Sequence, residues 1–84
     1  MYPTVIWDDQ PGGNVEHIAL NALNPDEVDE VLLDTSIPIG RSRSTGRPCK
    51  FWWTSTGKYI IVIWDVLNDD PLIIVPVTAY EVSP

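Results

Sequence analysis

Cysteine and histidine are scarce in this sequence of 84 residues, which contains one of each, Cys49 and His17. A single cysteine cannot form an internal disulfide, so the sequence excludes a disulfide-stabilised secreted scaffold. One histidine and one cysteine are too few for a zinc site of the usual ligand types, and we expect no metal and no cofactor. The side chains left for chemistry are therefore charged, hydroxyl and aromatic ones.

Long apolar runs are also absent. The longest uninterrupted run, residues 59–64, is far shorter than the roughly 18 residues that a membrane-spanning helix requires. The first residues, 1–4, lack the charged start and the apolar stretch of a secretory signal peptide. We therefore expect a cytoplasmic protein that does not associate with a membrane.

Basic residues are few, and they all lie in one segment. The sequence has 5 Lys and Arg against 12 Asp and Glu, a formal net charge of −7. The cations, which all lie in a stretch without an acid, are Arg41, Arg43, Arg47, Lys50 and Lys58. The net charge excludes a wholly basic nucleic-acid binder and a polybasic membrane anchor. The basic segment nevertheless remains a candidate anion site.

The first half of the chain predicts two helices. Residues 15–23 place apolar side chains at helical spacing, and Asn14 is the expected N-cap. A second helix begins after Asn24, with Pro25 in its first position and Glu27 completing a capping box. The length and the 44% hydrophobic content are those of one globular domain, residues 1–84.

The remaining apolar segments predict strands, separated by a loop over residues 35–46. The expected strands are residues 4–7, 49–54, 58–66 and 72–80. Pro76 predicts a bulge or an edge, because proline cannot donate to a strand ladder. The strand at 58–66 is apolar on both alternating faces, so it is either covered on both or meets a partner on one. We expect an α+β fold in the order β-α-α-β-β-β, with two helices packed on one face of a mostly antiparallel sheet.

The basic segment is the strongest local signal for a site. Arginine side chains match the geometry of phosphate oxygens, and Trp52 and Trp53, which follow directly, could stack on bases. The candidate phosphate or RNA contacts are Arg41, Arg43, Lys50, Lys58 and Trp52. The alternative is a solvated loop whose arginines pair with acids of the second helix and whose tryptophans belong to the core.

Two further side chains are candidates for proton transfer. His17 is the only imidazole, the group that most often exchanges protons near neutral pH, and the alternative is an exposed helical residue. Tyr80 ends the last strand, where its hydroxyl could donate to a phosphate, and the alternative is a half-buried ring with a solvated tip. Asp8-Asp9 and Asp69-Asp70 are interpreted as turn-forming residues rather than catalytic pairs.

Taken in order, these motifs resemble the BrnT-like branch of the RelE-like toxin superfamily. The residues that carry the resemblance span most of the chain and are Trp7-Asp8, Asn14, His17, residues 27–32, Gly46-Arg47, residues 56–58 and Thr78-Ala79. The likeness is greatest to a divergent group that shares the Pro-Gly-Gly-Asn-x-x-His motif of residues 11–17 and the Pro-Val-Thr-Ala-Tyr-Glu motif of residues 76–81.

The resemblance implies a metal-independent endoribonuclease, the toxin of a type II toxin–antitoxin system that a cognate antitoxin protein holds in check. In such enzymes the ribose 2′-hydroxyl attacks the adjacent phosphate while basic side chains stabilise the developing charge. Arg47 occupies the one charged site position that this sequence shares with the family. The implied catalytic set is Arg47 as phosphate stabiliser, with Tyr80 and His17 as proton-transfer candidates.

A second hypothesis is a non-enzymatic protein-interaction module that retains the toxin scaffold. Its basic loop would dock an acidic surface, and its tryptophans would form the interface. This hypothesis predicts that Trp52 or Trp53 is exposed. A homodimer through the same sheet edge is a variant of it.

Overall fold

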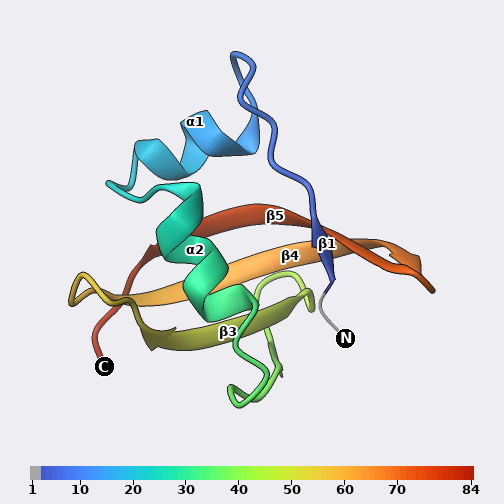
Figure 1. Ribbon diagram of the computed structural model, residues 1–84. Helices are drawn as coiled ribbons and strands as arrows, with labels where there is room; N and C mark the ends of the chain where they lie inside the picture. Colours follow the sequence, from blue (N-terminus) through green and yellow to red (C-terminus); the bar gives the residue numbers. More distant parts are fainter. Residues whose placement is uncertain (1–2) are drawn as a thin grey trace.

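The computed structural model describes residues 3–84 as a five-stranded sheet with two helices (Figure 1). In chain order the elements are β1 (Thr4–Val5), α1 (Asn14–Ala19), α2 (Pro25–Leu32), β2 (Gly40–Arg41), β3 (Pro48–Trp53), β4 (Tyr59–Asp69) and β5 (Leu72–Glu81). The sheet order is β1-β5-β4-β3-β2, and all neighbouring strands are antiparallel except β1 and β5. The predicted α+β class and mostly antiparallel sheet are confirmed.

Both helices lie on one face of the sheet, as predicted (Figure 1). The main core fills the space between the helices and the sheet. Val28 and Val31 of α2 face inward, because residues three or four apart share one side of a helix. Ile60, Val62 and Trp64 alternate along β4 toward the helices. All of these side chains are at most 4% exposed, so this cluster supplies most of the apolar burial.

The opposite face of the sheet, here called the open face, has no helix over it within residues 3–84. Strand alternation and register place on it Cys49, Phe51, Trp53, Tyr59, Ile61, Ile63, Thr78 and Tyr80. Ile61 and Ile63 are only 7% exposed, since they pack against Cys49 and Val82. β4 is apolar on both of its alternating faces because one face packs into the main core and the other into this smaller cluster.

The second helix begins as the sequence predicts. The Asn24 side chain accepts a hydrogen bond from the Glu27 amide at 2.9 Å, and the Glu27 carboxylate accepts one from the Asn24 amide at 3.3 Å. This is the capping box, with Pro25 in the first turn where its missing N–H costs nothing. Within residues 3–84, neither helix has the length and apolar character that crossing a bilayer demands.

The first helix is shorter than predicted, and the assignment of Asn14 as its N-cap is wrong. Gly13 holds the cap position without a side-chain bond, and the helix ends at Ala19. The Asn14 side chain instead forms hydrogen bonds with residues outside the helix. Its amide nitrogen donates to the Ile6 and Pro76 carbonyls at 3.0 Å each, and its oxygen accepts from the Asp8 amide at 2.8 Å.

The outer edge of β5 is covered along its length. Thr4 and Val5 pair with its first half in parallel, and the Ile6 amide extends this pairing by donating to the Ile74 carbonyl at 2.9 Å. Beyond that point Asn14 and Asn21 donate to the Pro76 and Ala79 carbonyls at 3.0 Å each. Polar side chains from α1 and the turn after it therefore replace a neighbouring strand, which protects this edge from further pairing.

Two other strand predictions have different outcomes. The irregularity expected at Pro76 is confirmed: the β4–β5 register shifts between Ile63 and Trp64, opposite this proline. The loop predicted over residues 35–46 is wrong in part, because Gly40 and Arg41 form β2. This strand of two residues pairs with Cys49 and Pro48, so it exists through a tertiary contact that local sequence does not encode.

Candidate functional site

Lys50 lies on the helix side of the sheet and closes the end of α2. Its Nζ donates to the carbonyls of Leu32 and Asp34 at 2.9 and 2.8 Å, and the residue is only 6% exposed. Burial lowers the pKa of this ammonium, and the charge of Asp34 partly offsets that effect. A cation at a helix C-terminus also complements the helix dipole. The candidate phosphate contact therefore has a structural use in the folded chain.

Lys58 is also engaged on the helix side. Its Nζ lies 3.0 Å from a carboxylate oxygen of Glu27 and donates to the Ala22 carbonyl at 2.7 Å. Thr56 donates to the same carboxylate at 2.5 Å. The Thr56 hydrogen bond and, after it, Lys58 lower the pKa of Glu27, although burial opposes them. These contacts fasten the β3–β4 turn to the beginning of α2.

Arg47 lies at the open face and pairs with an acid of the sheet. Its Nε donates to an Asp65 carboxylate oxygen at 2.7 Å, across the β3–β4 register. Arg41 donates to the Gly46 carbonyl at 3.3 Å within its own loop. Arg43 is exposed and forms no ion pair among the described residues. One interpretation of the sequence expected these arginines to pair with acids of α2. Among the described residues they do not.

His17 and Tyr80 lie at the β5 side of the sheet. The His17 Nε2 atom is 3.0 Å from the Thr78 hydroxyl, and Tyr80 follows two residues later on the open face. Tyr80 is opposite Ile61, whereas the Arg47 pair is at Asp65, four positions further along β4. Four residues of strand span about 13 Å. The structure thus brings His17 and Tyr80 to one region but places Arg47 too far away to share one phosphate with them.

The end of β3 carries a run of three exposed aromatic side chains. Phe51, Trp52 and Trp53 are 44%, 51% and 48% exposed, which is unusual for three consecutive aromatic side chains. Trp52 lies on the helix side, and the other two lie on the open face, where the Trp53 ring is 5.1 Å from that of Tyr59. The hypothesis of an interaction module predicted an exposed Trp52 or Trp53, and this is confirmed.

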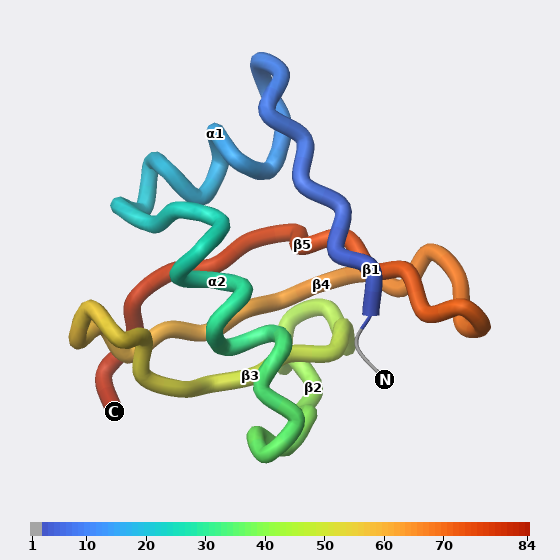
Figure 2. Tube along the Cα trace, in the orientation of Figure 1, coloured from blue at the N-terminus to red at the C-terminus, as the bar shows by residue number. Residues whose placement is uncertain are grey.

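The outer edge of β3 is open over the same residues. Figure 2 shows β2 beside the start of β3, where it pairs with Pro48 and Cys49 and then ends. In the described chain no strand pairs with the outer side of residues 50–53. The Thr54 N–H donates to the Lys58 carbonyl, so the peptide groups of Thr54 and of every second residue before it face β4. The peptide groups of Phe51 and Trp53, which lie between them, therefore point away from β4 to the open side. Sequence patterning indicated the aromatic run but not that its edge stays open.

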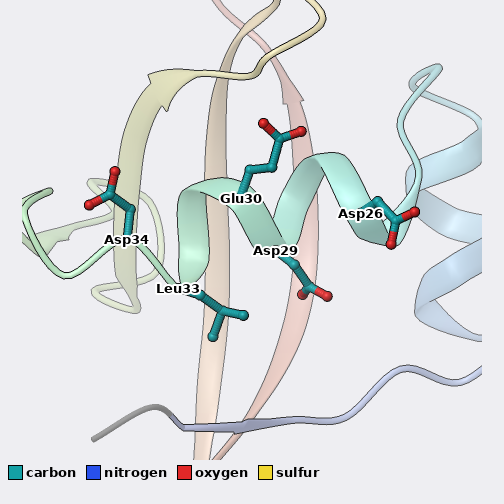
Figure 3. Close-up of a pocket in the computed structure, with 5 residues that line it drawn as sticks. All are labelled: Asp26, Asp29, Glu30, Leu33 and Asp34. Atoms are coloured by element: carbon teal, nitrogen blue, oxygen red, sulfur yellow. The ribbon is translucent and has the colours of Figure 1, made fainter.

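The outward side of α2 carries a separate acidic surface (Figure 3). Its lining residues are Asp26, Asp29, Glu30, Leu33 and Asp34. The carboxylates point in different directions in Figure 3, and no group of three or more candidate ligands within residues 3–84 is placed to hold a metal. Asp29 accepts from the Trp7 indole at 3.0 Å, and burial raises its pKa. This surface opposes, rather than favours, contact with a polyanion.

Comparisons with family models, with curated proteins and with solved structures find no match for this chain. The resemblance to BrnT-like toxins therefore stays a prediction.

Proposed function

We propose that this protein is a protein-interaction module that binds an extended segment of another protein along the open edge of β3. The observation that carries the proposal is the coincidence of three exposed aromatic side chains with an unpaired strand edge over residues 51–53. Added strands gain main-chain hydrogen bonds from such an edge and specificity from side chains on either side of it.

The two edges of the sheet support this choice by contrast. The β5 edge is covered by β1 and by asparagine side chains, as natural sheets usually arrange. The end of β3 has no such protection: residues 51–53 include no proline, no charge and no bulge. An open segment of β3 in a protein that covers the outer side of β5 is best explained by a partner.

The rings also supply what a binding hot spot needs. Tryptophan and other aromatic residues dominate the binding energy of interfaces, because they bury a large area with few rotatable bonds. Trp52 stands on one side of the strand and Phe51 and Trp53 on the other. A partner strand beside β3 would therefore contact rings on both of its faces.

A pair of variants at one position tests the main-chain contribution. Phe51→Ala removes the ring and keeps the outward N–H, whereas Phe51→Pro removes both without breaking the β4 ladder. Peptides selected from a random display library against the wild-type protein should bind Phe51→Pro at least about tenfold more weakly than Phe51→Ala. Isothermal titration calorimetry measures both affinities.

The control is Leu20→Ala, which truncates an exposed side chain next to α1, remote from β3. It should leave peptide affinity unchanged. The proposal is contradicted when the selected peptides bind both Phe51 variants equally, or when they perturb no β3 amide in a nuclear magnetic resonance titration. Arg47→Ala should leave binding intact, since Arg47 is engaged by Asp65 on the open face.

The endoribonuclease hypothesis makes a different prediction for the same Arg47→Ala variant. A toxin of this kind would inhibit growth on overexpression and cleave RNA, and the variant would do neither while remaining folded. Far-ultraviolet circular dichroism checks the fold. RNA cleavage by the wild-type protein that disappears in Arg47→Ala would favour the toxin hypothesis over the interaction module.

A further inference from the structure

A second candidate site lies on the helix side of the sheet, beyond the end of α2. A hollow of about 460 Å³ opens there between the β-strands, the start of β1 and the segment that leads from α2 to β2. This volume is within the range that small ligands occupy in proteins. The hollow is lined near the start of β3, so it is distinct from the aromatic residues at that strand's end.

The walls of the hollow are mainly apolar. Val66 of β4 is 45% exposed there and Leu72 of β5 is half-buried, whereas Ile37, Trp64 and Ile74 line the hollow at no more than 6% exposure. Ile39, which is 65% exposed, lies at the same hollow. Apolar walls of this kind favour a ligand with a hydrocarbon or aromatic body, because its transfer from water is the main source of affinity.

Among the residues that the structure describes, the charged groups of the hollow are all of one sign. Arg41 and Lys50 line it, and no aspartate or glutamate of this part of the chain does. In a chain with 12 acids and 5 bases, a lining with two cations and no acid is a distinctive local environment. An anionic head group is the complement of this arrangement, since it would face the buried charge of Lys50 and the exposed guanidinium of Arg41.

Within residues 3–84, both cations keep hydrogen-bond donors that the fold does not use. Lys50 donates two N–H groups to the Leu32 and Asp34 carbonyls, and an ammonium has three. Arg41 makes one hydrogen bond in this part of the chain, to the Gly46 carbonyl at 3.3 Å, and a guanidinium has five N–H groups. Burial lowers the pKa of the Lys50 ammonium, so an added negative charge would stabilise its protonated form.

We propose that this hollow binds a small amphiphilic monocarboxylate, with the carboxylate at Arg41 and Lys50 and the apolar body against Ile39, Val66 and Leu72. The proposal is independent of the β3 edge. It concerns a free carboxylic acid of the fatty-acid or arylalkanoic class, whose head group matches a guanidinium and an ammonium and whose tail matches the apolar walls.

Sodium decanoate, kept below its micellar concentration, is the probe, and decanol is the matched uncharged ligand. In a titration of isotope-labelled protein by nuclear magnetic resonance, decanoate should shift the Trp64 indole signal and the amides of residues 37–41. It should bind at least about tenfold more tightly than decanol. Equal affinity of the two ligands would overturn the proposal, as would shifts confined to residues 51–53 and the open face.

Variants at the mouth of the hollow keep the test independent of Lys50, whose removal would also disturb α2. Arg41→Gln should weaken decanoate binding about tenfold and leave decanol unaffected. Ile39→Glu places an acid at the hollow and should abolish decanoate binding. Arg43→Gln, a nearby exposed arginine outside the hollow, is the control and should change nothing. Unaltered decanoate affinity in Arg41→Gln would also overturn the proposal.

Discussion

At the scale of single residues, most charged side chains of this protein serve the fold. Lys50 and Lys58 bond carbonyls at or just beyond the ends of α2 and α1, where free carbonyl groups need donors. Arg47 balances Asp65 on the sheet. The basic segment therefore does not form one shared anion site, because Lys50, Lys58 and Arg47 contact different parts of the fold.

The contribution of Glu27 to the stability of the fold should depend on pH in a measurable way. Its folded pKa is depressed below the ordinary value of 4.5, first by the Thr56 hydrogen bond and then by Lys58. The stability it contributes is therefore fully present above pH 4.5 and is lost as the pH falls through the lowered folded pKa. Glu27→Gln should reduce the free energy of unfolding by about 1–3 kcal/mol at pH 7 and flatten its decline toward pH 3.

Urea denaturation followed by tryptophan fluorescence, repeated from pH 7 to pH 3, measures this effect. Glu81→Gln is the control, because Glu81 is exposed and forms no ion pair among the described residues. Its denaturation profile should match that of the wild type. A Glu27→Gln profile parallel to the wild type at every pH would contradict the assigned role.

At the scale of elements, sequence patterning succeeded where local chemistry decides the structure. Asn24, Pro25 and Glu27 define the start of α2 through contacts within a few residues, and the predicted capping box is present. The same reasoning failed for Asn14, whose side chain bonds to Pro76, 62 positions away. β2 was likewise missed, since a strand of two residues depends on its neighbour rather than on its own composition.

The candidate site was predictable to the same limited extent. The sequence placed Trp52 and Trp53 in a predicted strand over residues 49–54, and their exposure agrees with one of the two hypotheses. The unpaired edge beside them depends on where β2 ends, and no local pattern states this. The hollow at Arg41 and Lys50 was out of reach, because its walls come from distant segments.

The asparagine side chains that cover the outer side of β5 can be tested by substitution. Asn21→Ala removes the donor to the Ala79 carbonyl and should cost about 1 kcal/mol. Amide exchange of Thr78 and Tyr80 should then accelerate roughly fivefold, because local opening of β5 becomes easier. Asn68→Ala, which removes a hydrogen bond at the β4–β5 turn, is the control and should leave these two amides unchanged. Equal exchange in both variants would contradict the role of Asn21.

At the scale of the whole molecule, charge and shape set how copies meet. Each chain carries a net charge of −7, which opposes the approach of a second copy at low ionic strength. We therefore expect a monomer of 9.4 kDa by multi-angle light scattering in low salt. A doubled mass that reverts in Phe51→Pro would show that a second copy occupies the β3 edge. A doubled mass that persists in this variant would place self-association on a different surface. Either doubled mass would contradict the expected monomer.

The unequal edges of the sheet also limit how far any assembly can grow. A sheet with two open sides can add chains without end, as in a fibril, because every addition exposes a new side. Here the outermost strands, β1 and β2, have only two residues each, and Asn14 and Asn21 cover the rest of β5. Among residues 3–84, residues 50–53 of β3 have no strand on their outer side. Two copies that paired through residues 50–53 would each use this segment, and only edge strands of two residues would remain for further addition. Such an assembly would stop at a pair.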